Sequence, residues 1–438
     1  MATLLPEAQL PPPLPTLLPR LLAASAGARL ALVGGALRDL LLHRWHRDPW
    51  REVTDLDLVV EPPAIAPGQT AGQPDPPAHR LVQRLLAELD PAAVSFCHFH
   101  QAYGTVELEL ALPSGAGPGP AEPVLLDVAT ARAECYPAPA QNPQVCFGRL
   151  EDDLARRDFT VNAMALVLSP EGTQLLDPHG GAGDLQARQL RLLHPRSLVD
   201  DPTRLVRAAR YGARLGFSLE AESLTQARTT LQAWPWPWRP GDPVQQAPPA
   251  LGTRLRMELE LLLEREPWPQ ALALLQRWQG LLLLDPALQA DVCWLRRLRW
   301  AARAGLPPLM ALLAGAADPA SLAARLQLPH RQQRVLQAFA QLRHELALPD
   351  RDERAAWLPS AWTLWLERHP LAEEAVPLAL ACGLGPRRPL LRWWRQWRHV
   401  DAGVRAQDLI ASGMQPGPAL GQRLRELRRQ RLDQEARR

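Results

Sequence analysis

A pair of glycines, Gly34 and Gly35, lies between an apolar run and a leucine-rich segment, and it constrains the fold of this chain more than any other feature. Such a sequence predicts a strand that turns through the glycines into an amphipathic helix. The turn would leave free backbone N–H groups at the start of the helix, with Arg38 one turn further on. Backbone N–H groups and a guanidinium together suit an anion such as a triphosphate.

Asp55 and Asp57 open the next apolar run, which predicts a second strand. Because strand side chains alternate, both carboxylates point to one face, while Leu56 and Leu58 point to the core. Two carboxylates about 7 Å apart raise each other's pKa unless a cation lies between them. Magnesium fits this place because it takes hard oxygen ligands and keeps open positions for phosphates. An isolated Asp-x-Asp also occurs in turns, surface pairs and calcium loops.

A third acidic residue, Asp127, lies in the apolar run Val124–Val128. If this run forms a strand beside the one that begins at Asp55, Asp127 adds a third carboxylate to the pair. The local pattern equally allows an edge strand whose aspartate faces water. The sequence by itself leaves both arrangements open.

The basic residues of the chain are all arginine, and no lysine is present. This argues against kinases, ATP-grasp enzymes and ligases, whose chemistry depends on a lysine amine. The formal net charge is only +3, so affinity for nucleic acid has to come from local basic faces. Five scattered cysteines without C-x-x-C spacing, no signal peptide and no long apolar stretch indicate a cytoplasmic protein that does not cross a membrane.

Strand signals are confined to the first half of the 438 residues. Residues 1–26 are rich in proline and predict a flexible arm that leads to a short helix. The run Glu151–Ala165 predicts one helix with acidic residues in its first turn. Beyond Leu219 the pattern is helical, and Trp234–Pro240 begins an extended loop that is expected to reach about Pro249. The predicted class is α+β, a mixed head followed by an all-helical remainder.

Asp201 and Arg204 lie at the start of a predicted helix, with Pro202 in its first turn. Cytosine and adenine both present an amino donor beside a ring-nitrogen acceptor, whereas uracil and guanine present the reverse. A carboxylate acceptor and a guanidinium donor three residues apart therefore fit C and A together and reject U and G. An ordinary helix cap with an ion pair would also explain the two residues.

Near the end of the chain, Arg388, Arg392, Arg395 and His399 fall on one face of a predicted helix, with the tryptophans largely off that face. The pattern fits a surface that follows RNA phosphates. It also fits an amphipathic helix that packs its tryptophan side inward, and this second interpretation is favoured for the segment alone.

Five motifs follow one another in order: Gly34-Gly35-x-x-Arg38-Asp39, Asp55-x-Asp57, Arg156-Arg157-Asp158-Phe159-Thr160-x-Asn162-Ala163, Asp177-Pro178-x-Gly180-Gly181 and Asp201-x-x-Arg204. The series resembles the tRNA nucleotidyltransferase and poly(A) polymerase family of the bacterial, class II type. The resemblance covers roughly Leu32 to Pro286, and the segment Asp408–Leu427 is similar to the family's C-terminal segment. One departure is Asp200, where the family usually has glutamate.

The resemblance implies a polymerase-β-like nucleotidyltransferase head over residues 27–196. A helical neck with the base-reading helix and the Trp/Pro loop would follow over residues 197–290, and a helical body and tail that bind RNA over residues 291–438. Asp55 and Asp57 would bind the metal, with Asp127 as a third catalytic carboxylate. The nucleotide-binding positions would be Gly34, Gly35, Arg38, Arg157, Asp158, Asn162, Asp201, Arg204 and Arg207.

These observations predict a Mg²⁺-dependent, template-independent enzyme that adds C and/or A from CTP and ATP to the 3′ end of tRNA and releases pyrophosphate. Addition of only CC, only A, or poly(A) to general RNA would use the same base reader, and the motifs do not separate these activities. A catalytically inactive RNA-binding protein and a sugar transferase of the DxD type are the alternatives from other classes. The sequence says nothing about oligomeric state.

Overall fold

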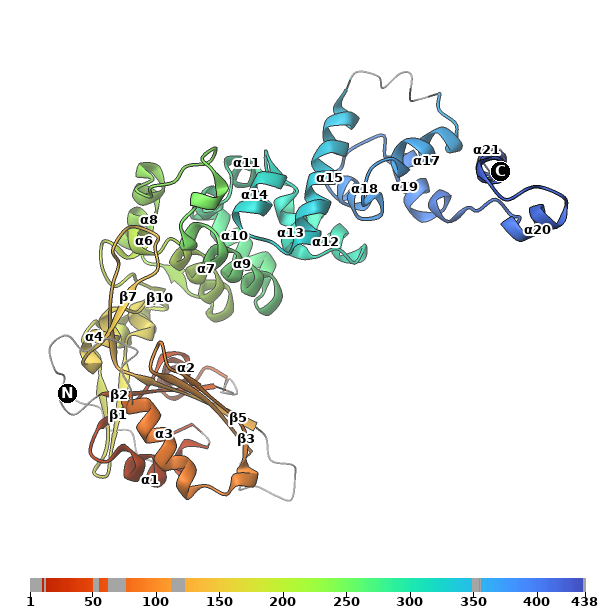
Figure 1. The fold of residues 1–438 in the computed structure, drawn as a ribbon. Coiled ribbons are helices and arrows are strands. Elements are labelled where there is room, and N and C mark those ends of the chain that lie inside the picture. The colour runs from red at the N-terminus through yellow and green to blue at the C-terminus, as the bar shows by residue number, and fades with distance from the viewer. Residues whose placement is uncertain are drawn as a thin grey trace. The chain divides into compact units, whose positions relative to one another are not determined.

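The computed structural model describes residues 10–11, 13–49, 55–61, 76–111, 123–348, 354 and 356–435. The chain divides into two compact units, Met1–Pro237 and Trp238–Arg438, and each is described by itself (Figure 1). The first unit contains a mixed sheet with helices packed on it, and the second is helical. This architecture confirms the predicted α+β class.

Seven strands of the first unit form one sheet in the order β3-β4-β5-β2-β1-β8-β9. β2 runs parallel to β5 and antiparallel to β1, so the strand with the two aspartates lies in the middle of the sheet. Leu56, Leu58 and Val60 alternate along β2 and are buried, as the predicted strand requires. The strands are β1 (Arg29–Val33), β2 (Asp55–Glu61), β3 (Val94–His100), β4 (Thr105–Ala111), β5 (Pro123–Thr130), β8 (Ala165–Ser169) and β9 (Gly172–Leu176).

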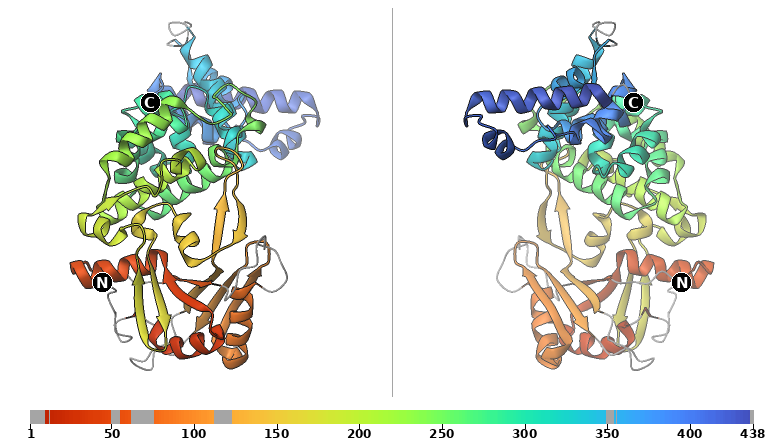
Figure 2. Two further views of the ribbon diagram at one scale, coloured as in Figure 1. Left: turned by 90° about the vertical axis from the view of Figure 1, so that its left-hand side faces the viewer. Right: turned by 90° about the vertical axis from the view of Figure 1, so that its right-hand side faces the viewer.

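Helix α3 (Pro77–Glu88) covers the apolar face of the sheet, where the backbone N–H of Ala78 donates to Oγ1 of Thr130 at 3.2 Å. Helix α1 (Leu14–Ser25) packs against α3 (Figure 2). On the opposite face, α4 (Leu150–Ala155) buries its leucines against the alanine and valine side chains of β1 and β2. Helix α2 (Gly34–His46) follows β1 directly. The sheet is therefore covered by helices on both faces.

The short helix predicted to follow the arm is confirmed as α1, but it begins at Leu14, inside the residues 1–26 that were assigned to the flexible arm. Leu14, Leu17 and Leu21 are fully buried, because their spacing of three and four places them on one helix face. This apolar face packs on the rest of the unit, and its burial stabilises the helix despite the many prolines around it. Residues 1–9 and 12 of the predicted arm lie outside the described residues.

The prediction of a single helix from Glu151 to Ala165 is also wrong. Helix α4 ends at Ala155, a 3-10 turn (η3) spans Thr160–Asn162, and β8 begins at Ala165. Phe159 has extended backbone with φ −133° and ψ 150°, and it pairs with Leu192 on a neighbouring segment. This tertiary pairing breaks the helix and leaves Arg157 and Asp158 in a turn.

Short elements complete the first unit. Strands β6 (Arg132–Cys135) and β7 (Gln144–Phe147) form a hairpin, and β10 (Gln189–Leu190) pairs with β11 (Ser218–Leu219). The helices are α5 (Gly181–Ala187), α6 (Ser197–Asp200), α7 (Thr203–Leu215) and α8 (Ala221–Ala233). Helix α7 begins directly after Pro202, as predicted.

The division between the two units falls inside the predicted neck and not at its start. Helices α6 to α8 belong to the first unit, so the head and the first part of the neck, residues 197–237, form one compact body. Trp236 helps to hold this body together, because it is buried and its indole Nε1 donates to the carbonyl of Val199 at 3.0 Å. The segment from Trp234 contains a loop as predicted, with a short 3-10 turn at Val244–Gln246.

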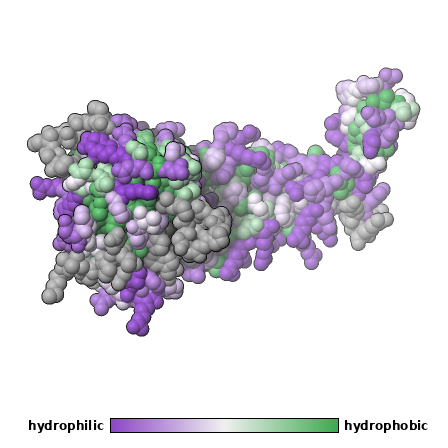
Figure 3. Space-filling view, turned by 90° about the horizontal axis from the view of Figure 1, so that it is seen from below, coloured by the Kyte–Doolittle hydropathy of each residue, from purple (hydrophilic) through white to green (hydrophobic). Residues whose placement is uncertain are grey.

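The second unit is helical throughout its described residues, as predicted. Its α-helices are α9 (Thr253–Arg265), α10 (Trp268–Arg277), α11 (Pro286–Ala290), α12 (Trp294–Arg303), α13 (Pro308–Leu313), α14 (Pro319–Arg325), α15 (His330–Ala347), α17 (Pro359–Glu367), α18 (Ala372–Ala381), α19 (Arg387–Arg395), α20 (Ala406–Ala411) and α21 (Pro418–Glu435). The 3-10 turns are η4 (Val244–Gln246), η5 (Pro249–Leu251), η6 (Gly280–Leu283) and η7 (Trp397–His399). Figure 3 shows hydrophilic side chains over most of the visible surface of this unit. Among the described helices of both units, none has the length and apolarity needed to cross a membrane.

Candidate active site

The parallel pairing of β2 with β5 brings the predicted carboxylates together. Asp57 and Asp127 are direct register partners, and Asp55 lies two residues earlier on the same face of β2. Glu107 of β4 is in turn the register partner of Asp127. Since paired residues on neighbouring strands have Cβ atoms about 5 Å apart, three acidic side chains follow one another across the sheet. Of the two arrangements that the sequence left open for Asp127, the structure has the one in which its strand lies next to Asp57.

Burial and neighbouring negative charges raise the pKa values of Asp57 and Asp127. Burial raises the pKa of Asp57, Arg157 lowers it in part, and Asp55 raises it further. Burial, followed by the negative charges of Asp57 and Glu107, raises the pKa of Asp127 to about 6. A divalent cation would remove this repulsion, because it stabilises the charged form of each group.

Within the described residues, no group of three or more acidic, histidine or cysteine side chains is close enough together to hold a metal ion by itself, but the chemistry of the donor set fits a hard cation. Asp55, Asp57 and Asp127 supply only carboxylate oxygens, which are the ligands that Mg²⁺ prefers. Mg²⁺ commonly binds through one or two carboxylates and completes its coordination with water and phosphate oxygens. An open carboxylate group on the face of a sheet is compatible with that chemistry.

The glycine turn packs directly against Asp57. Gly34 has φ +71°, which favours glycine, and a Cβ atom at this position would lie 2.5 Å from Oδ2 of Asp57 and 3.5 Å from Nη1 of Arg157. Gly35 follows in the first turn of α2 and carries no such restriction, since its Cβ would meet only Nη2 of Arg38 at 3.6 Å. Gly34 is therefore required for the close approach of the turn to the carboxylate.

Arg38 is buried and already engaged by protein groups. Its Nε and Nη2 donate to the carboxylate of Asp39 at 2.9 and 3.0 Å, and its Nη1 donates to Oδ1 of Asn162 at 2.9 Å. The guanidinium also lies over the ring of Tyr211, 5.4 Å from its centroid. The structure thus places Arg38 behind the glycine turn, where it connects α2 to η3.

A cavity of about 560 Å³, here called the carboxylate cavity, opens on the face of the sheet that carries the aspartates. Asp57 and Asp127 line it together with Arg132, Arg156 and Arg157. Acidic and basic groups thus face each other across a space that could hold a metal with a polyphosphate. His100, Tyr103 and Glu107 also line the carboxylate cavity and were not predicted.

Asp153 holds the two arginines of the motif in place. Its side chain is fully buried, with Oδ1 accepting from Arg156 at 2.7 and 3.0 Å and Oδ2 accepting from Arg157 at 2.9 and 3.3 Å. Burial alone would raise the pKa of Asp153, but Arg157 and Arg156 outweigh it and hold the pKa below its ordinary value. The acid-rich first turn of α4 was the only signal for this residue in the sequence.

Asp158 and Asn162 form a buried network. Asp158 Oδ1 accepts from Nδ2 of Asn162 at 3.0 Å, and its Oδ2 lies 3.1 Å from Nη2 of Arg207. Through Asn162 the network reaches Arg38. Burial would raise the pKa of Asp158, but Arg207 and the hydrogen bond from Asn162 hold it low. The structure therefore brings together four of the predicted nucleotide-binding residues.

A second cavity of about 420 Å³, here called the Arg204 cavity, lies in the same unit. Arg204 is buried, and its Nη2 donates to the carbonyl of Arg156 at 3.0 Å. Arg156 lines both cavities. The cavity that contains Asp57 and Asp127 and the cavity that contains Arg204 therefore have one lining residue in common. The other lining residues are Ala133, Glu134, Cys135, Tyr136, Asp152, Ala155, His194, Arg196 and Asp200.

Asp201 and Asp200 differ in their positions. Asp201 caps α7, where its Oδ1 accepts from the backbone N–H of Thr203 at 3.0 Å and from the hydroxyl of Thr203 at 2.6 Å. This is the helix-cap arrangement that the sequence allows as an alternative. Asp200, which departs from the family pattern, lines the Arg204 cavity. Its Oδ1 accepts from Nη2 of Arg196 at 3.2 Å.

Comparisons with known proteins show the family to which the chain belongs. Residues 30–191 match the family described as the poly(A) polymerase head domain. The CC-adding tRNA nucleotidyltransferase of Deinococcus radiodurans is 34% identical over 414 residues, which cover 92% of this chain and 85% of the relative. The A-adding tRNA nucleotidyltransferase of Aquifex aeolicus is 37% identical over 193 residues, 44% of this chain and 19% of that protein.

Among solved structures, the apo form II of a CCA-adding enzyme covers 96% of this chain and 92% of its own, with a TM-score of 0.66 and 23% identity. At this identity the likeness supports the fold. The identity to the Deinococcus relative extends over nearly all of both chains. The chain therefore belongs to the tRNA nucleotidyltransferase family, with a head domain of the poly(A) polymerase type.

Proposed function

We propose that this chain is a template-independent nucleotidyltransferase that adds C and/or A from CTP and ATP to the 3′ end of tRNA and releases pyrophosphate. One observation carries the proposal. The carboxylate cavity and the Arg204 cavity lie in one compact unit and share Arg156, so a nucleotide could present its triphosphate to the first and its base to the second. Because tRNA is the proposed substrate, we place the reaction in the cytoplasm.

Asp55, Asp57 and Asp127 would hold Mg²⁺, which activates the RNA 3′-hydroxyl and neutralises charge on the triphosphate when it is bound. Side chains of the protein bind and orient the nucleotide. Arg157 faces Asp57 at the carboxylate cavity and supplies the positive charge that meets the phosphates. Asp153 keeps that guanidinium in a fixed orientation, so that little reorganisation is needed when the nucleotide binds.

The base is read at the Arg204 cavity. Arg204 presents donors, and a carboxylate beside it supplies the acceptor that matches the amino group of C or A. Asp201 was predicted for this role and would have to exchange its contacts with Thr203 to reach the base. Asp200 lines the cavity and can supply an acceptor without that exchange. The aspartate in place of the usual glutamate leaves more room in the cavity.

Among the narrower activities, we propose addition of C residues as the first to be tested. The relative that matches over nearly the whole chain is a CC-adding enzyme, whereas the A-adding relative matches less than half of the chain. Poly(A) addition to general RNA is kept as an outcome of the experiment below, because the base reader does not exclude it.

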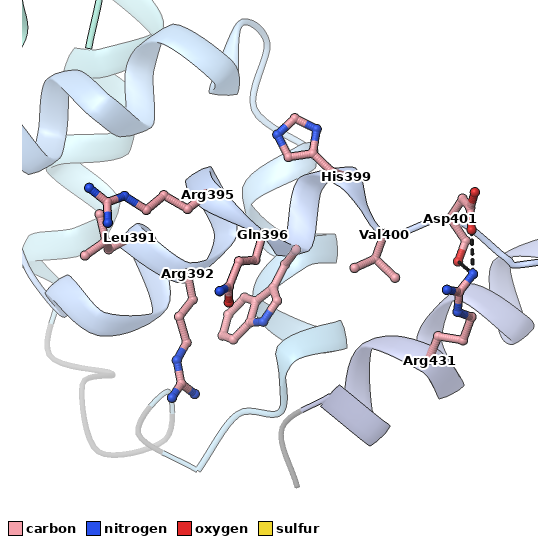
Figure 4. Close-up of a pocket in the computed structure, with 9 residues that line it drawn as sticks. Leu391, Arg392, Arg395, Gln396, His399, Val400, Asp401 and Arg431 are labelled. Atoms are coloured by element: carbon pink, nitrogen blue, oxygen red, sulfur yellow. Dashed lines mark hydrogen bonds and ion pairs between the residues drawn. The ribbon is translucent and has the colours of Figure 1, made fainter. Parts of the chain in front are cut away.

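We further propose that the second unit binds the RNA backbone through a groove of about 830 Å³ beside α19, here called the α19 groove. Figure 4 shows Arg392 and Arg395 on α19 at this groove, with Arg431 of α21 paired to Asp401. Trp393 is buried on the inner side of the helix, as an amphipathic helix with its arginines outward requires. The exposed arginines remain available for phosphates.

The α19 groove is tested by the salt dependence of tRNA binding. Replacing both Arg392 and Arg395 by alanine should reduce the slope of log affinity against log salt by about 1–2, since each lost phosphate contact contributes a little under one. Arg331→Ala is the control, because this side chain of α15 is 80% exposed and lies outside the groove. An unchanged slope in the double variant would remove the groove from the RNA interface.

The activity itself is tested with three RNAs: tRNA that ends at the discriminator base, tRNA that ends in CC, and an unrelated RNA, each with one of the four nucleoside triphosphates. Addition of two C residues from CTP to tRNA that ends at the discriminator base, with no addition from any nucleotide to tRNA that ends in CC, would show a CC-adding enzyme. One addition from ATP only on the second would show an A-adding enzyme. Growth of the unrelated RNA with ATP would show a poly(A) polymerase.

The variant Asp55→Ala distinguishes catalysis from simple binding. Incorporation should disappear while tRNA affinity is kept, because the carboxylate acts on the metal and not on the RNA. Incorporation that survives this change would overturn the metal assignment. Binding of a nucleotide sugar without affinity for tRNA would instead support a sugar transferase, and tRNA binding without any incorporation by the wild type would support an inactive RNA-binding protein.

A further inference from the structure

His194 lies in the loop between β10 and α6, and its side chain lines the Arg204 cavity. Its backbone is fixed by two residues. The N–H of His194 donates to Oγ of Ser197 at 3.3 Å, and its carbonyl accepts from the N–H of Ser197 at 3.0 Å and from Nε2 of Gln226 at 3.2 Å. These contacts determine where the imidazole enters the cavity.

The imidazole and Arg204 contact each other. Nε2 of His194 lies 3.5 Å from Nη1 of Arg204, at the outer limit of a hydrogen bond. A guanidinium has only donors, so a hydrogen bond at this contact requires Nε2 of His194 to accept, with the ring neutral and its proton on Nδ1. The other end of the guanidinium donates to the carbonyl of Arg156 at 3.0 Å. Arg204 is thus held between two acceptors.

We propose that His194 is a positioning residue for the base-reading guanidinium of Arg204, and that discrimination between nucleobases requires the neutral imidazole. The inference rests on the proposed function. When the imidazole gains a proton, Nε2 becomes a donor and the ring becomes a cation beside Arg204. The guanidinium then loses one of its two acceptors and is repelled from its place, so the donors no longer face the base in a fixed direction.

The charges around His194 favour the neutral ring at neutral pH. Burial lowers the pKa of His194, Arg204 lowers it further, Asp200 offsets part of this effect, and Arg196 lowers it again. The other titratable residues that line the cavity are Glu134, Cys135, Tyr136, Asp152 and Arg156. Protonation is therefore expected only below the ordinary histidine range, on the acid side of about 6.5.

The experiment measures the ratio of kcat/KM for CTP over UTP on tRNA that ends at the discriminator base, between pH 5.5 and 8.5. A ratio is used because titration of Asp127 and of the other groups at the carboxylate cavity affects both nucleotides and cancels. For the wild-type chain the ratio should fall about fivefold or more toward acid pH, the effect expected when one buried polar contact is lost. A constant ratio over this range would overturn the proposal.

Variants separate positioning from folding. His194→Gln keeps an acceptor and cannot be protonated, so it should keep discrimination and lose its pH dependence. His194→Leu removes the acceptor and should lower the ratio at every pH. His179→Gln is the control, because burial also lowers the pKa of His179, while this residue precedes α5 and does not line the Arg204 cavity.

The outcomes also distinguish the two proposals. If the wild-type chain incorporates no nucleotide, the proposed function fails and this inference falls with it. If incorporation is normal but His194→Gln keeps the pH dependence of the wild type, only the role of His194 is overturned. Thermal melting of each variant shows whether a lowered ratio comes from a folded protein.

Discussion

Gly34 and Asp57 approach so closely that a Cβ atom on the glycine would lie 2.5 Å from Oδ2 of the carboxylate. A side chain at residue 34 would therefore have to displace the carboxylate that the metal is proposed to use. The positive φ of Gly34, +71°, adds strain for any other residue, about 1–2 kcal/mol.

We expect Gly34→Ala to lower kcat by about 100-fold, because a displacement of about 1 Å at the reacting groups has an effect of this size. Steady-state incorporation kinetics give the measurement. Gly183→Ala is the matched control, since a Cβ there meets nothing within 4 Å, and its activity should equal that of the wild type. Normal kcat in Gly34→Ala would show that Asp57 can move without consequence.

The raised pKa of Asp127 makes the stability of the first unit depend on pH. Because the pKa is about 6 in the folded chain and about 4 in the unfolded chain, the folded state binds the proton more tightly. The stabilising contribution of this group is complete below about pH 4 and is lost as the pH rises through about 6.

Asp127→Asn removes the charge and should therefore raise the melting temperature above pH 6 in the presence of a chelator, with little effect near pH 4. Differential scanning calorimetry at the two pH values tests this. Added Mg²⁺ should raise the melting temperature of the wild type at pH 8 more than that of the variant. Equal Mg²⁺ effects in both chains would exclude Asp127 from the metal site.

We expect Asp153 to be as important for nucleotide binding as the two arginines that it holds. Asp153→Ala leaves Arg156 and Arg157 without their buried partner, which should cost about 3–5 kcal/mol of stability and raise KM for the nucleotide. Its pKa lies below the ordinary value, so its contribution to stability is present above about pH 4 and is lost as the pH falls through the lowered pKa.

Chemical denaturation at pH 7 and KM measurements test this prediction. Glu151→Ala serves as the control. That residue is also in the first turn of α4, but its carboxylate accepts from Arg29 at 3.0 Å, does not hold the two arginines and lines neither cavity. A similar KM in both variants would show that Asp153 has no special role.

Asp153 also illustrates which parts of the site a sequence can reveal. Asp55, Asp57 and the glycine turn are local patterns, and the alternation of charged and apolar residues placed them correctly on a strand and a helix start. The pairing of Asp57 with Asp127 joins two strands that are distant in sequence, so local periodicity could only leave it open. At Asp153, an ordinary acidic first turn gave no sign of a fully buried carboxylate that pairs with two arginines.

The features that the sequence did not reveal also depend on contacts between distant segments. The predicted helix from Glu151 to Ala165 fails because Phe159 pairs with Leu192, a tertiary contact that overrides helical spacing. Asp39 and Asn162 accept hydrogen bonds from Arg38, and nothing in the local sequence indicated that Asn162 would lie there. The role of Arg38 in binding the triphosphate stays a prediction. Contacts between distant segments determine the geometry of this site.

Trp236 gives a last prediction, on the Trp/Pro segment whose purpose the sequence did not reveal. Its indole donates to the carbonyl of Val199, which directly precedes Asp200 at the Arg204 cavity. Trp236→Phe keeps most of the apolar volume but leaves that carbonyl without its donor, so unfolding should become easier by about 1–3 kcal/mol and the melting temperature should fall by a few degrees. Trp45→Phe, at a side chain of α2 that is 36% exposed, should change neither the free energy of unfolding nor the melting temperature.

The contact that Trp236→Phe removes holds α6, so this variant should also lower the ratio of kcat/KM for CTP over UTP. A lower melting temperature with an unchanged ratio would limit the role of this tryptophan to stability.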